Sequence, residues 1–66
     1  MIKAGSWVLG AGEWMTVLSV DGDRAFCAGR DGGRRFFRHY RTDSLTVHGE
    51  AGEQALAELR IEHERG

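Results

Sequence analysis

The sequence predicts a single small all-β domain, a barrel of four to five short antiparallel strands followed by a short C-terminal helix or flexible tail. The chain has only 66 residues, enough for one domain with a small core. Ten of them are glycine and none is proline, a composition that a simple helical bundle would not tolerate. The glycines also divide residues 1–49 into short apolar segments, spaced about eight to twelve residues apart as in small barrels.

The first two predicted strands lie on either side of a glycine-rich turn. Residues 6–9 (Ser-Trp-Val-Leu) form the first strand, and residues 10–12 (Gly-Ala-Gly) close it. Residues 14–20 have the strongest strand pattern in the chain, because β-branched and aromatic side chains favour a pleated sheet. The pair Asp21-Gly22 follows and predicts a two-residue hairpin turn in which both central positions have positive φ.

The rest of the barrel continues the same alternation of strand and turn. Residues 25–28 are predicted as the return strand, residues 30–33 (Arg-Asp-Gly-Gly) as the next turn and residues 34–40 as a fourth strand. A tight helical turn is expected at residues 42–45, and a short last strand at residues 46–48.

The composition changes after the last predicted strand. Residues 53–64 contain good helix formers and no glycine, so they predict a helix. The apolar positions on one face of it are 55, 56, 59 and 63. A helix of about twelve residues is marginal without packing. We therefore expect a barrel domain at residues 1–49 and an acidic C-terminal helix or tail at residues 50–66, which docks on the barrel, pairs with another subunit or stays flexible.

Several short motifs within residues 5–48 resemble the YodC-like family of short bacterial proteins. The matching motifs are the glycine-led strand at residues 5–8, the glycine-rich turn and Met-Thr-Val strand at residues 10–17, the central cysteine at Cys27, the late aromatic at Phe36 or Phe37 and the closing leucine at Leu45. The resemblance implies an SH3-like barrel and a bacterial or phage source. It implies no particular chemistry, because the family has no established activity to transfer.

The charges are distributed unevenly although their sum is only −1. Residues 1–23 carry a net charge of −2, residues 24–41 a net charge of +5 and residues 42–66 a net charge of −4. A basic centre between acidic ends can bind anions, or two surfaces of opposite charge can neutralise each other.

The basic centre includes an arginine- and aromatic-rich strand at residues 34–41. Alternation places Arg34, Phe36, Arg38 and Tyr40 on one side of the strand, and Arg35, Phe37, His39 and Arg41 on the other. If Phe37 faces the core, the opposite side displays arginines that pair with phosphate and rings that stack on bases, as in proteins that bind single-stranded nucleic acid. In the alternative, one phenylalanine belongs to the core, the other covers a sheet edge, and the arginines keep the strand soluble or contact the acidic tail.

Two tryptophans, Trp7 and Trp14, lie within the first predicted hairpin. Trp14 flanks the glycine-rich turn, where SH3-like folds often present aromatic side chains to ligands. Because rigid aromatic side chains concentrate binding energy, Trp14 is a candidate contact for a partner. In the alternative, both indoles cap the ends of the barrel core.

No catalytic, metal or cofactor site is predicted. Cys27 is the only cysteine, and no spacing places His39 or His48 beside it as a base, so we expect a buried structural thiol. The three histidines lack the spacing of metal ligands, and residues 10–12 lack the lysine of a phosphate-binding loop. No apolar run approaches the roughly 20 residues of a membrane span, and no secretion signal opens the chain. With a single free thiol, this composition suggests a cytoplasmic protein.

These observations predict a small non-enzymatic binding module that makes protein–protein contacts, including self-association, through Trp14 and the strand at residues 34–41. The residues expected to form the contact surface are Trp14, Arg34, Phe36, Arg38, Tyr40 and Arg41. The alternative is a module that binds RNA or single-stranded DNA through Arg34, Arg38 and aromatic stacking. Neither hypothesis involves a cofactor, a membrane or a small-molecule substrate.

Overall fold

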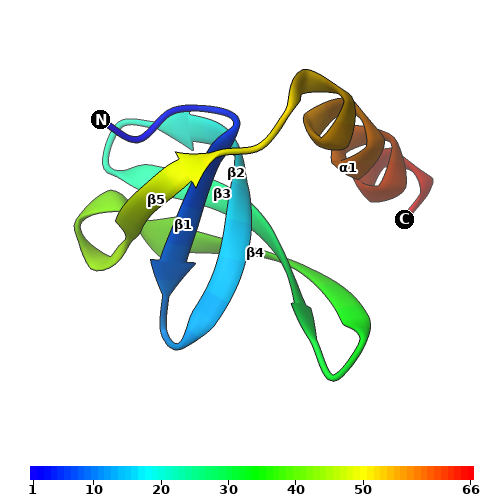
Figure 1. The fold of residues 1–66 in the computed structure, drawn as a ribbon, viewed down its shortest axis with the longest axis horizontal. Coiled ribbons are helices and arrows are strands. Elements are labelled where there is room, and N and C mark those ends of the chain that lie inside the picture. Colours follow the sequence, from blue (N-terminus) through cyan, green and yellow to red (C-terminus); the bar gives the residue numbers. More distant parts are fainter.

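The computed structural model describes residues 1–66 and consists of five strands, a short 3-10 turn and one helix (Figure 1). The elements are β1 (Ser6–Gly10), β2 (Glu13–Asp21), β3 (Arg24–Asp31), β4 (Arg34–Arg41), the 3-10 turn η1 (Thr42–Ser44), β5 (Thr46–Glu50) and α1 (Glu53–Arg65). Every predicted element is present, and the observed strands extend beyond the predicted ones at one or both ends.

All strands belong to one antiparallel sheet with the order β4-β3-β2-β1-β5. In Figure 1, β5 lies beside β1, while the β3–β4 hairpin extends to the other side of β2. The all-β class with a short C-terminal helix is therefore confirmed. Strands β4 and β5 are the two edges and do not pair with each other, so the sheet is curled but not closed.

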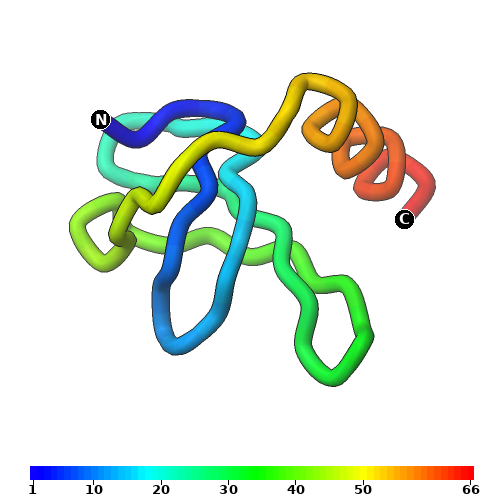
Figure 2. The backbone as a smooth tube through the Cα atoms, viewed as in Figure 1, coloured from blue at the N-terminus to red at the C-terminus, as the bar shows by residue number.

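Three tight hairpin turns connect the first four strands, and their backbones form the three loops in the tube of Figure 2. The two-residue loops are Ala11-Gly12, Gly22-Asp23 and Gly32-Gly33. Both central residues have positive φ in the first and third loops, as type I′ turns require. In the middle loop only Gly22 does, at +60°. The predicted positive φ at both Asp21 and Gly22 was wrong, because Asp21 still pairs within β2 and Gly22 opens a loop of the II′ kind.

The sheet has a buried apolar cluster on each face. The inner cluster contains Val8, Met15, Val17, Ala25, Cys27 and Leu45, with Ile2, Phe36 and Tyr40 half-buried against it. The outer cluster contains Leu18, Ala28 and Leu59, with Phe26, Phe37 and Leu56 against it. Val17 packs in the inner cluster and the next residue, Leu18, packs in the outer one, as alternation along a strand requires. An irregularity in the β2–β3 ladder leaves Leu18 without a direct partner.

The helix α1 docks on the outer face of the sheet through a few contacts. Leu59 is its only buried residue, with 8% of its surface exposed, and Leu56 is half-buried beside it. Arg60 Nη2 donates a hydrogen bond to the carbonyl of Leu18 at 3.0 Å, and Arg35 pairs with Glu62 at 3.2 Å. Of the three arrangements considered for the acidic segment, docking on its own sheet is the one observed. The helix is neither long nor apolar enough to cross a membrane.

Candidate functional site

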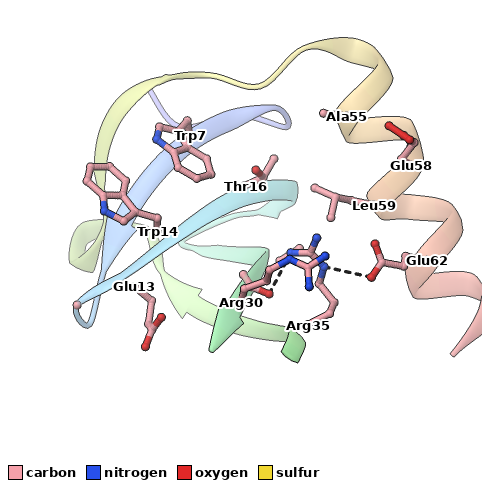
Figure 3. Close-up of a pocket in the computed structure, with 13 residues that line it drawn as sticks. Trp7, Glu13, Trp14, Thr16, Arg30, Arg35, Ala55, Glu58, Leu59 and Glu62 are labelled. Carbon is pink, nitrogen blue, oxygen red and sulfur yellow. Dashed lines mark hydrogen bonds and ion pairs between the residues drawn. The ribbon is translucent and has the colours of Figure 1, made fainter. Parts of the chain in front are cut away.

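An open groove of about 630 Å³ lies on the outer face of the sheet, beside α1 (Figure 3). Its floor is formed by small side chains of β2 and β3, including the directly paired Thr16 and Ala28. One wall consists of two tryptophans, and the other is the face of α1 that carries Glu58 and Leu59. A floor of small residues allows the backbone of an extended segment to approach the sheet closely.

The two tryptophans of this aromatic wall belong to a row of three aromatic rings. Trp7 and Trp14 stack with their centroids 5.6 Å apart and their planes within 7°, and His48 contacts Trp14 edge-on at 4.9 Å. The register of the β1–β2 hairpin explains the stack. Leu9 lies directly opposite Trp14, and Trp7, two residues before Leu9, is on the same face of the sheet and diagonally across from Trp14. Trp7 and Trp14 nevertheless remain 39% and 46% exposed. Large apolar side chains that are rigidly held yet exposed are typical of binding surfaces.

Two arginines, from β3 and β4, lie at one end of the groove. Arg30 and Arg35 are direct partners in the β3–β4 ladder and lie together below Leu59 in Figure 3. Arg35 Nε pairs with Glu62 Oε1 at 3.2 Å, and its Nη1 donates to the carbonyl of Gly29 at 3.1 Å. Arg30 Nη1 donates to the carbonyl of its own hairpin loop, at Gly33. Because of these contacts, the positive charges at this end of the groove are partly satisfied within the molecule.

Among the predicted contact residues, only Trp14 lies in the groove. Arg34, Phe36, Arg38, Tyr40 and Arg41 are all on β4, outside it. Phe36 and Tyr40 are half-buried against the inner cluster, and the Arg38 guanidinium lies 4.6 Å from the centre of the Phe36 ring. Arg41 pairs with Asp23 and Asp43. Arg34 is exposed, in the first position of the strand.

Both faces of β4 contribute to packing. Phe37 belongs to the outer cluster, while Phe36 and Tyr40 cover the inner one. Alternation correctly places Phe36 and Tyr40 on one side of the strand. Alternation does not predict that the opposite side of β4 is also covered, because this requires α1 to pack on the outer face.

Several groove residues were not among the predicted contacts. Trp7 shares the aromatic wall with Trp14, and Glu58, Leu59 and Glu62 reach the groove from α1. The position of Trp7 beside Trp14 follows from the length of the loop between β1 and β2. A two-residue loop fixes the register of the hairpin, and this register places the two indoles diagonally across from each other. Nothing local in the sequence indicates which face of the sheet receives α1.

Cys27 is buried in the inner cluster, as expected, with none of its surface exposed. Burial raises the pKa of its thiol to about 11, so the group is protonated at neutral pH. Its Sγ points to the carbonyl of Ala25 at 3.8 Å, within its own strand. A thiol in this environment lacks the thiolate character of a nucleophile. The structure contains no cluster of three or more histidine, cysteine or acidic side chains suited to a metal ion.

Comparison of the chain with protein-family models, curated proteins and solved structures found no match.

Proposed function

We propose that this protein is a non-enzymatic binding module that contacts a protein partner through the groove, with Trp14 and Trp7 as the central contacts. The observation that carries the proposal is the stacked, exposed pair of indoles beside an open groove. The buried, protonated thiol of Cys27 supports a non-enzymatic role, because the only cysteine is no nucleophile.

The aromatic wall suits a binding role for an energetic reason. Trp7 and Trp14 are held on neighbouring strands by the hairpin register and by each other, so few rotamers are lost when a partner binds. Buried tryptophans are among the side chains that contribute most to interface affinity. The same indoles contribute less to folding, since each leaves more than a third of its surface in water.

The proposal includes an SH3-like barrel that is open between β4 and β5, in line with the resemblance to the YodC-like family. The strand order and the 3-10 turn η1 between β4 and β5 support it. Two unpaired edges in so small a sheet also favour contacts between copies of the chain, with β4 as the basic edge. We place this module in the cytoplasm.

A display selection against the folded protein tests the proposed function. Selected peptides are titrated while the two indole N–H resonances are followed by NMR, since Trp7 and Trp14 are the only tryptophans of the chain. Trp14→Ala should weaken binding tenfold or more, and Val47→Ala, an exposed apolar residue outside the groove, should leave it unchanged. Peptides that bind Trp14→Ala as tightly as the unchanged protein would contradict the proposal.

Binding of RNA or single-stranded DNA is the second candidate. It is favoured by Arg34 and Arg38, which form no ion pair, on the most basic strand of the chain. Titration with a short RNA and a short DNA at two salt concentrations tests it, because phosphate contacts weaken steeply as salt rises. Replacement of both arginines by alanine should then weaken binding uniformly across sequences. Absence of binding at low salt excludes this candidate.

A further inference from the structure

Strand β4 leaves one side of its backbone unpaired. It forms one edge of the sheet (Figure 1) and pairs with β3 alone, and Thr42 N donates to the carbonyl of Asp23 at 2.8 Å. Hydrogen-bonded and non-bonded pairs alternate along an antiparallel ladder, so this bond fixes the direction of every backbone group in β4. The N–H and C=O groups of Arg35, Phe37 and His39 point away from β3 and have no partner. Such a row is a template for another strand.

The inner side of this edge carries two arginines with an aromatic ring between them. Arg34, Phe36 and Arg38 alternate along β4, and Phe36 is half-buried against the inner cluster. The Arg38 guanidinium lies 4.6 Å from the centre of this ring. Both arginines are exposed and neither forms an ion pair, although Asp31 is the direct ladder partner of Arg34. Two positive charges, four residues apart, are therefore free on one side of the edge.

The other two arginines of β4 are engaged within the molecule. Arg35 pairs with Glu62 of α1, and Arg41 pairs with Asp23 and Asp43. Both alternate onto the opposite side of the strand from the free arginines. A ligand that approaches the edge finds its unneutralised charges on the inner side alone.

From these observations we propose that β4 binds an extended acidic segment of another protein, which adds to the edge as an antiparallel strand. The segment bonds to the unpaired backbone groups of β4, and side chains at the intervening positions then face each other most closely. Carboxylates lie opposite Arg34 and Arg38, and an apolar side chain covers the ring of Phe36. The segment thus has acidic residues on either side of an apolar one, with one residue between each. This site is separate from the groove and does not depend on the proposed function.

A second copy of the chain does not supply such a strand. Another β4, centred on Phe36, would place Arg34 opposite Arg38, and directly opposed like charges repel. The other free edge, β5, has one acidic residue, Glu50, which pairs with Lys3. A nucleic acid offers phosphates to the arginines but no row of donors and acceptors at the spacing of a strand. The chemistry of the edge therefore favours a different protein as the partner.

Three peptides with blocked ends test the inference. The acidic peptide is Thr-Glu-Thr-Val-Thr-Glu-Thr, and the other two replace both glutamates by glutamine or by lysine. In titrations followed by the backbone N–H resonances of Arg35, Phe37 and His39, the acidic peptide should bind about fivefold more tightly than the glutamine peptide, with the lysine peptide weakest. The three amide protons should also exchange more slowly in the complex, since they gain hydrogen bonds. Equal affinity of the acidic and glutamine peptides would overturn the inference.

A double variant tests the role of the free arginines. Arg34→Gln with Arg38→Gln should abolish the difference between the acidic and glutamine peptides. Arg24→Gln with Arg65→Gln is the matched control, because it removes two positive charges from exposed positions that form no ion pair and lie outside β4. This control should preserve the difference. The same effect of both double variants would show that net charge, and not the edge, attracts the peptide.

Methylation of peptide nitrogens tests the strand pairing itself. In the proposed antiparallel strand, the two threonines beside the valine direct their N–H groups to β4, whereas the valine N–H points away. N-methylation of these threonines should therefore abolish binding, and N-methylation of the valine should preserve it. Equal effects of the two changes, or the reverse order, would overturn the inference.

The indole N–H resonances of Trp7 and Trp14 distinguish this site from the groove. If the acidic peptide shifts the indoles and leaves the β4 amides unchanged, the inference fails while the proposed function stands. If the acidic peptide does not bind at millimolar concentration, the inference likewise fails without consequence for the groove. A short single-stranded RNA that binds more tightly than the acidic peptide, and loses affinity in Arg34→Gln with Arg38→Gln, would overturn the inference in favour of nucleic acid.

Discussion

Gly29 lies directly opposite Phe36 in the β3–β4 ladder, and the Phe36 ring occupies the space that a side chain at position 29 would need. A Cβ built on Gly29 would lie 2.5 Å from Cζ of Phe36 and 2.9 Å from Cγ of Met15. Gly29 is therefore required for close packing and not for an unusual backbone angle. Its bare backbone lets an aromatic ring of the edge strand reach the inner cluster.

Gly29→Ala should lower the free energy of unfolding by about 2 kcal/mol, because the methyl group must displace Phe36 and Met15 in a close-packed core. Gly49→Ala is the control. It also changes a strand glycine to alanine, but a Cβ there meets no atom within 4 Å. We expect its stability to change by less than about 0.5 kcal/mol. Urea unfolding of both variants measures the difference, and equal stabilities would contradict the packing role of Gly29.

The strands and hairpins could be predicted because their signals are local. Strand β2 is rich in β-branched and aromatic residues, and glycines at positions 22 and 32 supply the positive φ that two-residue hairpins require. The sheet order was less accessible. Pairing of β1 with β5 joins residues about forty positions apart and depends on how the whole sheet curls, so no short segment encodes it.

The groove was only partly predictable for the same reason. Trp14 was expected to be a contact because it flanks a turn, and the structure places it in the aromatic wall. The second wall arises because Leu59 of α1, more than forty residues further along the chain, packs on Leu18 of the outer face. Alternation along β2 places Leu18 on the outer face, but it does not indicate that α1 docks there, so the second wall required the structure.

The turn between β1 and β2 contains a strained residue, and relieving the strain should stabilise the protein. Ala11 has φ of +50° and is the only residue other than glycine with positive φ. Asparagine tolerates this conformation better than alanine does, and Asn-Gly is the favoured pair for such turns. We expect Ala11→Asn to raise the free energy of unfolding by about 0.5 to 1 kcal/mol, and Ala11→Val to lower it by about 1 kcal/mol. Thermal unfolding measures both; a more stable valine variant would show that the turn does not constrain φ.

Stability should decrease in alkali because Cys27 ionises more readily in the unfolded chain. Burial raises the pKa of this thiol from 9.0 to about 11 in the folded protein. Below pH 9 the thiol is protonated in both states, and its contribution to stability is fully present. Between about pH 9 and pH 11 the unfolded state loses the proton first, so the free energy of unfolding falls, by about 3 kcal/mol in total.

Urea unfolding at a series of pH values from 8 to 11 measures this decrease. Cys27→Ala is the control, because it removes the titrating group. The variant is less stable at every pH, since it leaves a small cavity in the inner cluster, but its stability should depend less on pH over this range. Parallel pH profiles for the two proteins would show that Cys27 does not cause the decrease.

The docking of α1 should depend on a single side chain. Leu59 is the only buried residue of the helix, and it packs on Leu18 and Ala28. A helix of 13 residues is marginal in water without such packing. Leu59→Ala should therefore release α1, so that the helical signal in circular dichroism falls while the sheet persists and stability drops by about 2 kcal/mol. Ile61→Ala, at a position that is 50% exposed, should change neither signal. Full helicity in Leu59→Ala would show that the other contacts of α1 hold the helix without Leu59. These contacts are the half-buried Leu56, the ring contacts of His63 with Phe26 and Phe37, the hydrogen bond from Arg60 to Leu18 and the ion pair of Glu62 with Arg35.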